Sequence, residues 1–546
     1  MRSERALGTL GRVFRRLSVV GIAVGIAAGS LWNGCAVTNT EDGRIVDAGM
    51  DDGPPPGSDL TCQRRPEEDT PDERFEDSNC DGIDGDITRA IFVSPNGDDT
   101  FIGTRETPVK TITQAIKLAQ QQGLPSVYAD KGTYPGSFSL VAGISVYGGY
   151  DSGNLWARSA TNDTVIQGGT TAVTGNNLAK ETHLELVSVT SANGTSPGQS
   201  TYGIFIANSS GPIILSQVKV KSGIGADGAS PTNPTAGTAG GNGGNGTGGC
   251  SASSCSGCNP KGPGGTAGTN SCLGSNVSGG KGGDASCDGG GAGGAPGSGA
   301  APGNGGSGGS RGDCVPGFYS GKSGSAGTDG GSGLDGNQGG QAPAVMPTNF
   351  TVAGYNPSNG GDGTAGSNGS GGGGGGAGGG GAGGLCNPDA GGGGGGAGAG
   401  GCAAPLGKGG GGGGGSFGLY IISSTVTVNN ATVASGQAGN GGKGANGATG
   451  GSGGSGAAAG GGSGDAAGGG RGGNGGKGGN SGAGAGGTGG PSYGIYAKGS
   501  QVTTNSVQAS AGAFGSGGNG GTATLRGATI QAAAGAPGQA GPLKFD

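Results

Sequence analysis

Glycine is the feature that most limits what this chain can fold into, because 150 of its 546 residues are glycine. Glycine has no side chain to bury, and fixing its backbone loses more conformational entropy than fixing that of any other residue. Only 12% of the residues are charged and 4% are aromatic, so an ordinary side-chain core has to be concentrated in a fraction of the length. The sequence therefore predicts a folded part that is interrupted by long glycine-rich segments.

The N-terminus has the pattern of an export signal. Five arginines precede the apolar run LSVVGIAVGIAAGSLW, which is too short and too rich in glycine for a membrane-spanning helix. The run stops at NGC (33–35), which resembles a lipobox, although Trp32 stands where lipoboxes usually carry leucine. We expect residues 1–34 to be removed and Cys35 to carry a lipid, with the protein held in the cell envelope at the outer membrane or cell surface. Ordinary secretion is the alternative.

The cysteines are expected to form disulfides, as is usual in exported proteins. The chain has eleven cysteines, and a lipidated Cys35 leaves an even number, ten, for pairing. Cys62 and Cys80 flank an acidic segment and are expected to pair, and the CxxC at 255–258 would be only half of a zinc site. The candidates are Cys62, Cys80, Cys250, Cys255, Cys258, Cys272, Cys287, Cys314, Cys386 and Cys402.

Charge is concentrated near the N-terminus, where 19 of the 35 Asp and Glu residues lie in the first 100 positions. Asp77, Asn79 and Asp81, followed by Gly82, reproduce the start of a calcium loop, in which oxygen ligands at alternate positions converge on the ion. Thr88 stands where such a loop usually carries its bidentate glutamate. Calcium is therefore the one cofactor that the sequence suggests, with an acidic turn closed by a disulfide at Cys80 as the alternative.

Nucleic acid is not expected as a partner. The sequence pI is about 5.0, and no basic stripe with interleaved aromatic residues occurs in the sequence, whereas phosphate neutralisation needs clustered Lys and Arg.

The pattern of a solenoid begins at Ile91. Residues 111–122 are expected to form a short helix, with Thr111 and Gln114 as a capping box and Gly123 as its end. Short apolar clusters follow at intervals of roughly 10 to 20 residues, separated by turn-forming Gly, Asn and Ser, which predicts stacked strands that bury one another coil by coil.

A family resemblance rests on several motifs in this order: IFVSPNGDD, GT, TPVKTITQAIKLA, VYADKGTY and ISVYGGYDSGNLWARS. Together they resemble the N-terminal module of pectin-lyase-like β-helix surface proteins, most of them of unknown function. The resemblance covers residues 90 to about 225. It implies an all-β, right-handed parallel β-helix in which helix 111–122 caps one end, where it would hide an edge that could otherwise template aggregation.

Three later segments share an aromatic-Gly-aliphatic-aromatic or closely similar opening, at Tyr202, Phe417 and Tyr493, and are expected to be coils of one solenoid. The glycine-rich insertions between them resemble PGRS-type repeats. Glycine recurs at every third residue from Gly441 to Gly456, which fits a packed polyglycine II helix, with a disordered low-complexity loop as the alternative.

The expected organisation is a signal peptide (1–34), an acidic tether with the calcium-type loop (35–89), N-terminal β-helix coils (90–228), a cysteine-containing glycine-rich insertion (229–415), a coil (416–438), a second glycine-rich insertion (439–491), another coil (492–512) and a glycine- and alanine-rich tail (513–546).

Catalytic chemistry has little support in the sequence, and no catalytic residue is predicted. The best cluster is Glu181, His183 and Glu185, which alternate along an expected strand and so could share one face. We expect this face to be the solvated outside of a coil. The other charged candidates are Asp130, Lys131, Asp151, Arg158 and Asp163.

We therefore expect a non-catalytic envelope protein with a structural, adhesive or matrix-contact role, whose partners are the membrane and extracellular polysaccharide or other surface proteins. The rival is a polysaccharide-binding or polysaccharide-degrading β-helix, a lyase or hydrolase, in which Tyr147, Tyr150 and Trp156 could stack on sugar rings. Their position next to the capped coils favours core packing instead.

Overall fold

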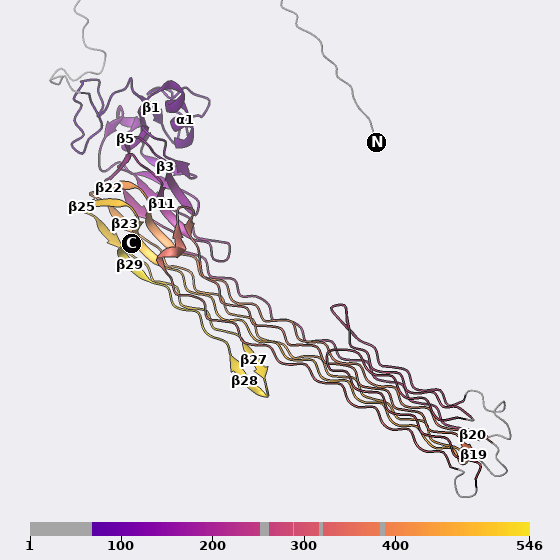
Figure 1. Cartoon of the computed structure of the whole chain (residues 1–546). Helices are drawn as coiled ribbons and strands as arrows, with labels where there is room; N and C mark the ends of the chain where they lie inside the picture. The colour runs from indigo at the N-terminus through magenta and orange to yellow at the C-terminus, as the bar shows by residue number, and fades with distance from the viewer. Residues whose placement is uncertain (1–67, 252–260, 288, 316–319, 383–387) are drawn as a thin grey trace, which may run out of the picture. The chain divides into compact units, whose positions relative to one another are not determined.

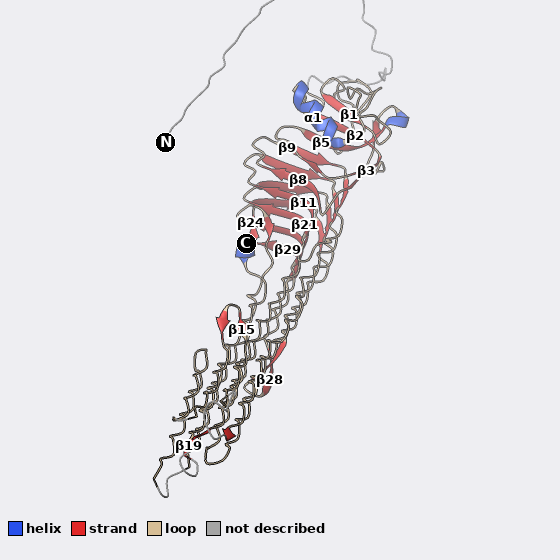
Figure 2. Ribbon diagram, turned by 90° about the vertical axis from the view of Figure 1, so that its right-hand side faces the viewer, coloured by secondary structure: helices blue, strands red, loops and turns tan. Residues whose placement is uncertain are grey.

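The computed structural model describes residues 68–251, 261–287, 289–315, 320–382 and 388–546. Within them, short strands stack in three parallel sheets that form a β-helix, as the sequence pattern predicts (Figure 1). Figure 2 shows the strands of successive coils lying side by side. The all-β fold class is thereby confirmed.

Beyond the first strand, which extends sheet A alone, each coil contributes one strand to each sheet. Sheet A stacks β1 (Ala90–Val93), β2 (Ser126–Asp130), β5 (Ser145–Asp151), β9 (Thr182–Glu185), β12 (Pro212–Ser216), β22 (Thr425–Asn429) and β25 (Gln501–Asn505), with β6 (Ala157–Arg158) antiparallel to β5. Sheet B stacks β3 (Gly132–Pro135), β7 (Thr164–Gln167), β10 (Ser188–Thr190), β13 (Lys219–Lys221), β23 (Thr432–Ala434) and β26 (Gln508–Ser510). Sheet C stacks β4 (Phe138–Ser139), β8 (Thr171–Asn176), β11 (Thr201–Ala207), β21 (Ser416–Ile422), β24 (Ser492–Lys498) and β29 (Ala540–Phe545).

The three repeated openings lie in register in sheet C, where Tyr202 pairs with Phe417 and Phe417 pairs with Tyr493. They are therefore coils of one solenoid, as expected. Strand β29 joins this sheet beyond β24, because its Ala540 pairs with Ser492 of β24. The segment expected to be a tail thus contains a strand of the β-helix.

The capping helix forms where the sequence predicts it. Helix α1 (Ile112–Gln122) begins after Thr111, whose side chain accepts a hydrogen bond from the backbone of Gln114, and it ends at Gly123 in the left-handed conformation. The Asp99 carboxylate accepts hydrogen bonds from the backbone and the hydroxyl of Thr111, and so ties the start of the helix to the preceding loop. The apolar face of α1 packs in the same core as the strands.

Side chains that point into the β-helix form one continuous aliphatic core. Two aromatic clusters lie on the outside of the sheets instead. One lies on sheet A around Tyr128, Tyr147 and Tyr150, and the other lies on sheet C around Phe417 and Tyr420.

The aromatic cluster on sheet C is covered by a strap, residues 346–356. The strap contains η3 (Pro347–Asn349) and the hairpin of β17 (Phe350–Thr351) and β18 (Gly354–Tyr355). Phe350 stacks on Tyr496 with 4.0 Å between ring centroids, and the Tyr420 hydroxyl donates to the Thr351 carbonyl. The strap therefore keeps these rings from solvent.

The long glycine-rich segments all leave the β-helix at the same corner. They follow β13, β23 and β26 in sheet B, and the chain returns through β21, β24 and β29 in sheet C. The described parts of residues 222–345, 357–415, 435–491 and 511–539 form what we call the glycine bundle. Figure 1 shows its segments running side by side.

Short hairpins and bridges interrupt the glycine bundle. They are the hairpin of β15 (Ser271–Cys272) and β16 (Ser275–Asn276), the hairpin of β27 (Thr522–Leu525) and β28 (Ala528–Gln531), and the small sheet of β14 (Cys250–Ser251), β20 (Pro388–Ala390) and β19 (Gly381–Ala382).

The bundle is held by backbone hydrogen bonds with a period of three residues. Gly395 donates to Gly470 of a parallel segment, and Gly396 and Gly394 donate to two other segments, at Gly244 and Gly283. The same directions recur three residues later, at Gly398, Ala399 and Ala397, which donate to Gly473, Gly241 and Gly280. Three residues per turn with bonds to several neighbours is the arrangement of packed polyglycine II strands. The insertions are therefore ordered in the described residues.

Glycine is required because the segments approach one another at backbone distance. A Cβ atom built at Gly398 would overlap the carbonyl carbon and oxygen of Gly454, and most other glycines of the bundle face a backbone carbonyl in the same way. Segments 371–382 and 391–401 contain only Gly and Ala, and both are buried throughout. In segment 237–249, which lies at the surface, only every third position, from Gly237 to Gly249, is always glycine. The Asn and Thr residues of this segment occupy the other two positions of the period, where they are exposed.

Surface side chains continue the ladder along the bundle. The backbone N–H of Asn440 donates to Asp227 Oδ1, and the Asn440 side-chain oxygen accepts from the N–H of Ser516. Asn233, Asn446 and Thr522 repeat the arrangement. These side chains pair the N–H groups that would otherwise face solvent at the bundle surface.

Candidate functional site

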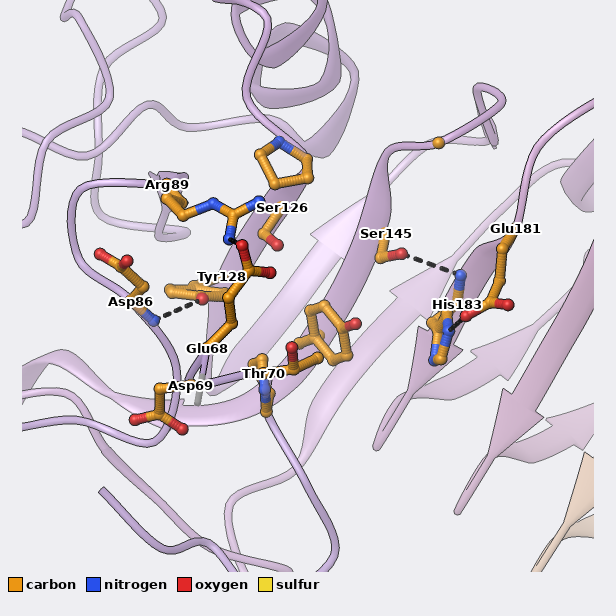
Figure 3. A pocket seen from close by; sticks show the side chains of 14 residues that line it. Glu68, Asp69, Thr70, Asp86, Arg89, Ser126, Tyr128, Ser145, Glu181 and His183 are labelled. Atoms are coloured by element: carbon orange, nitrogen blue, oxygen red, sulfur yellow. Dashed lines mark hydrogen bonds and ion pairs between the residues drawn. The ribbon is translucent and has the colours of Figure 1, made fainter. Parts of the chain in front are cut away.

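A pocket of about 210 Å³ lies on the outer face of sheet A (Figure 3). Strands β2, β5 and β9 form its floor, and Glu68, Asp69 and Asp86 of the segment that precedes β1 line its rim. Ser126 and Ser145 occupy equivalent positions on neighbouring strands, as do Tyr128 and Tyr147. The pocket therefore presents a polar wall built by the β-helix repeat itself.

Glu181 and His183 form an ionisable pair in the pocket wall, apart from the Arg89–Glu68 ion pair that lines the same pocket. His183 Nε2 lies 2.9 Å from Glu181 Oε1, and the two side chains are 23% and 61% exposed. The backbone N–H of His183 donates to the Ser145 hydroxyl, which fixes the strand rather than the imidazole. A carboxylate that orients an imidazole can support proton transfer, so this pair is the best candidate for chemistry among the described residues.

Glu185 lies on the same face, as the alternation predicts, but it is not solvated. Its carboxylate bonds to Arg158 at 2.8 Å, and Arg158 bonds to Asp84 at 2.9 Å. All three side chains are at least nine-tenths buried. The expectation of a solvated outer face is therefore wrong for Glu185, because residues 69–89 fold over this part of sheet A and exclude water.

Arg158 is held by many contacts besides the two carboxylates. Its guanidinium also donates to the carbonyls of Gly148 and Asp72, and its Cζ lies 5.4 to 5.6 Å from the ring centroids of Phe75, Tyr147 and Tyr150. One guanidinium therefore joins three parts of the chain, the N-terminal segment, β6 and β9, through charge-assisted hydrogen bonds.

Burial shifts the acid–base equilibria of this ion cluster. Loss of solvation raises the pKa of Asp84 to about 7, although Arg158 opposes the shift. Burial likewise raises the pKa of Glu185, again against the attraction of Arg158. Two carboxylates around one guanidinium leave a net negative charge when both are ionised, so the buried cluster favours one bound proton.

The remaining charged candidates make local structural contacts. Asp130 accepts from the hydroxyls of Ser94 and Ser152, and Asp163 accepts from the hydroxyl of Ser188. Lys131 Nζ lies 2.6 Å from Asp151 Oδ2, and this hydrogen bond lowers the pKa of Asp151. The structure does not bring these residues together with the Glu181–His183 pair.

The aromatic residues proposed for sugar stacking are buried. Tyr147, Tyr150 and Trp156 are 2%, 0% and 3% exposed, and they pack with Phe92 and Tyr128 under the N-terminal segment. None of these rings presents a face to solvent, so they hold the segment on sheet A.

The calcium-type loop closes through its own hydrogen bonds. The two oxygens of Asp77 accept from the N–H groups of Asp81 and Gly82, and Asp81 accepts from Ile83 and Ile87. Asn79 accepts from the Asp81 N–H and donates to its carboxylate. In the part of the chain that the structure describes, no group of three or more His, Cys, Asp and Glu is arranged to hold a metal. Calcium binding stays a prediction.

One disulfide joins two segments of the glycine bundle. Cys272 in hairpin β15–β16 bonds to Cys402, 130 residues away, and so confirms one expected staple. Cys80, Cys250, Cys287 and Cys314 are also disulfide-bonded. Cys62, Cys255, Cys258 and Cys386 lie outside the described residues.

The predicted lipidation site also lies outside the described residues, since these begin at 68 and the predicted signal and Cys35 precede them. Among the residues that are described, none of the helices has the length and apolar character needed to cross a membrane.

Sequence reasoning missed the buried ion cluster. The sequence pattern indicates Arg158 and Glu185 as candidates but not Asp84. Arg158 lies 27 residues from Glu185 and 74 residues from Asp84, and neither spacing links the residues. The available signal was a charged residue, Arg158, next to the aromatic stretch ISVYGGYDSGNLWA, since a charge among buried rings needs a partner.

Comparison with known proteins finds a match to a family of unknown function. A family model described as a protein of unknown function (DUF1565) matches residues 95–259. The match spans the N-terminal coils and the beginning of the glycine bundle, well under half of the chain, and it fits the β-helix that these residues form. No curated protein and no solved structure matches the chain.

Proposed function

We propose that this chain is an exported, lipid-anchored envelope protein with a structural, adhesive or matrix-contact role, and that it is not an enzyme. The observation that carries the proposal is the hydrogen-bonded glycine bundle. Fixing one backbone residue opposes folding by about 1–2 kcal/mol, so long glycine segments become ordered only where a dense lattice compensates for it. Such a lattice forms a rigid body, whereas glycine-rich linkers are flexible.

The dimensions and surface of the bundle suit contact over a large area. Segment 222–249 pairs with segment 435–461 throughout, which corresponds to about 80 Å at roughly 3 Å per residue. Its exposed positions carry mostly Asn, Thr, Ser and Ala. Short and mostly uncharged side chains on this segment of a rigid lattice offer a repeated hydrogen-bonding surface.

The test of this role distinguishes a function of the glycine bundle from a function of the pocket. Cells that lack the protein would be complemented with the native chain, with Gly398→Ala, which disrupts the lattice, or with Glu181→Gln, which alters the pocket. We expect surface attachment and retention in the matrix to fall with Gly398→Ala and to remain with Glu181→Gln. Full attachment by the lattice variant, with normal protein levels, would contradict the proposal.

The second candidate function is binding or cleavage of polysaccharide at the pocket, and the Glu181–His183 pair favours it. A glycosidase needs two carboxyl groups roughly 5 to 10 Å apart, and a lyase needs a base beside a site that stabilises the intermediate. The test is a screen of pectic, uronate and neutral polysaccharides with and without calcium, measured by reducing ends and by absorbance of unsaturated products. Turnover that His183→Ala abolishes would make this the better proposal.

A further inference from the structure

One row of the glycine bundle is occupied along only part of its length. Segment 261–270 lies in this row, where it accepts hydrogen bonds from the N–H groups of Gly241 and Gly244 on one neighbouring segment. It donates to the carbonyls of Gly394 and Ala397 on another neighbouring segment. Towards the β-helix the row stops, because the chain turns away there into the hairpin of β15 and β16 (Figure 2).

Beyond this hairpin the two neighbouring segments continue with open hydrogen-bonding groups. On one of them the N–H groups of Thr238 and Thr235 follow in the same three-residue series, and on the other the carbonyls of Ala403 and Leu406 do so. None of these four groups has a hydrogen-bond partner within the described residues. The row is therefore vacant here, although the donors and acceptors that would hold a segment in it are in place.

The vacant row forms a groove of about 630 Å³. It is lined by residues 235–238, 365–368 and 402–405 of three bundle segments, and by residues 271–273 of the hairpin. Leu273 lines it with a fully exposed side chain. The described residues that line the groove are all uncharged, so it suits a neutral ligand.

The groove has the width of one segment. The N–H of Ala403 donates to Asn368 Oδ1, and the N–H of Gly409 donates to Asp362 Oδ1. These side chains take the place that segment 277–285 occupies farther along the bundle, where it accepts the corresponding bonds. The adjacent row is therefore closed by the chain itself, and a single row remains open.

Segment 261–270 shows which kind of peptide fits this row. Its Gly265 and Gly268 lie so close to the carbonyls of Gly244 and Gly241 that a Cβ atom would overlap them. The positions between these glycines carry Thr and Ala. The row therefore accepts an extended peptide with three residues per turn and glycine at every third position.

We propose that this groove binds an extended glycine-repeat segment of another protein, which adds one polyglycine II strand to the bundle. The main-chain hydrogen bonds would supply affinity, as they do when a peptide adds a strand to the edge of a sheet. The inference rests on the matrix-contact role proposed above for its biological setting. Binding to the groove is measured on purified protein and not by cell attachment, so the two proposals can fail separately.

The probe is a fluorescent synthetic peptide with the sequence of residues 261–270, KGPGGTAGTN. Its binding to the purified full chain is measured by fluorescence anisotropy. The control peptide carries alanine in place of Gly262, Gly265 and Gly268. We expect saturable binding of the glycine peptide and no binding of the control, because each new Cβ would overlap the backbone that lines the row.

Two substitutions on one segment form a matched pair. Thr235→Pro removes an N–H that faces the groove, whereas Ala239→Pro removes an N–H of the series that faces solvent. Proline suits the backbone of a polyglycine II segment, so both variants should keep the native circular dichroism. We expect Thr235→Pro to bind about tenfold more weakly, since it loses a hydrogen bond, and Ala239→Pro to bind normally. Ala365→Phe, on the facing segment, should fill the groove and abolish binding.

Amide hydrogen exchange of Thr235 and Thr238 provides an independent check, and we expect fast exchange that slows when the peptide binds. The proposal is wrong if the native chain does not bind the peptide, or if it binds the control peptide equally well. Native affinity in both Thr235→Pro and Ala365→Phe would place the peptide elsewhere and would overturn it as well. Slow exchange without peptide would mean that another segment of the same chain fills the row, which also contradicts the proposal.

Discussion

Replacing Gly398 with alanine should disrupt the glycine bundle locally. The new Cβ would lie well inside the 3.0 Å that real Cβ atoms keep from other heavy atoms, and the atoms it meets belong to the backbone of Gly454 and Ser455. Backbone cannot rotate away as a side chain can. The neighbouring segment therefore has to move outward, although hydrogen bonds on both sides of the contact hold it in place.

The size of the effect follows from those contacts. Gly454 donates to Ala399 at 2.8 Å, and Ala457 donates to Gly396 at 2.8 Å. Losing two net hydrogen bonds removes about 2 kcal/mol, and overpacking a close-packed region adds roughly 1–3 kcal/mol. We expect a local destabilisation of about 3–5 kcal/mol, which corresponds to exchange of these amides that is roughly a hundredfold faster or more.

The assay is native-state amide hydrogen exchange of the full chain, which does not require that so large a protein unfold in one step. Gly461→Ala is the matched control, because a Cβ at Gly461 meets nothing within 4 Å. Alanine there should leave exchange unchanged or slow it slightly, since it restricts the unfolded chain. If both variants exchange alike around Gly454, the close-packed lattice argument is wrong.

Other predictions concern the buried ion cluster, the disulfide and the lipid anchor. Arg158→Met leaves two buried carboxyl groups without their cation, and should lower the thermal unfolding temperature by the equivalent of about 3–5 kcal/mol. Burial raises the pKa of Asp84 to about 7, so the folded protein holds this proton more tightly than the unfolded chain does. The stability that comes from this difference is fully present below pH 3.8 and is lost as pH rises towards 7. A melting temperature that stays flat over this window in the native chain, or that changes as much in Asp84→Asn, would contradict this. Removal of the Cys272–Cys402 bond by Cys272→Ser should destabilise the bundle by about 2–4 kcal/mol, measured against Cys402→Ser, which should give the same value. Cys35→Ser should abolish labelling with a fatty acid and membrane fractionation, and retention of both would place the anchor elsewhere.

The sequence alone determined the elements whose causes are local or repeated. Thr111 and Gly123 mark the two ends of helix α1, because capping uses residues within one turn of the helix end. The openings at Tyr202, Phe417 and Tyr493 predicted stacked coils, because a repeated pattern buries one face on the next. The glycine period likewise pointed to polyglycine II, since three residues per turn and the absence of a Cβ are properties of the chain itself.

Only the tertiary structure decided between an ordered bundle and a disordered loop. Gly396 donates to Gly244 and accepts from Ala457, and both partners lie far away in the sequence. Composition does not say which segments meet. The same is true of Glu185, which alternation placed on an outer face. Its burial depends on Arg158 and on Asp84, 101 residues earlier by numbering, being brought over that face. A charged residue in a sequence pattern can lie in solvent or pair with an opposite charge in the interior. Which of the two occurs depends on whether the folded chain brings such a charge to it.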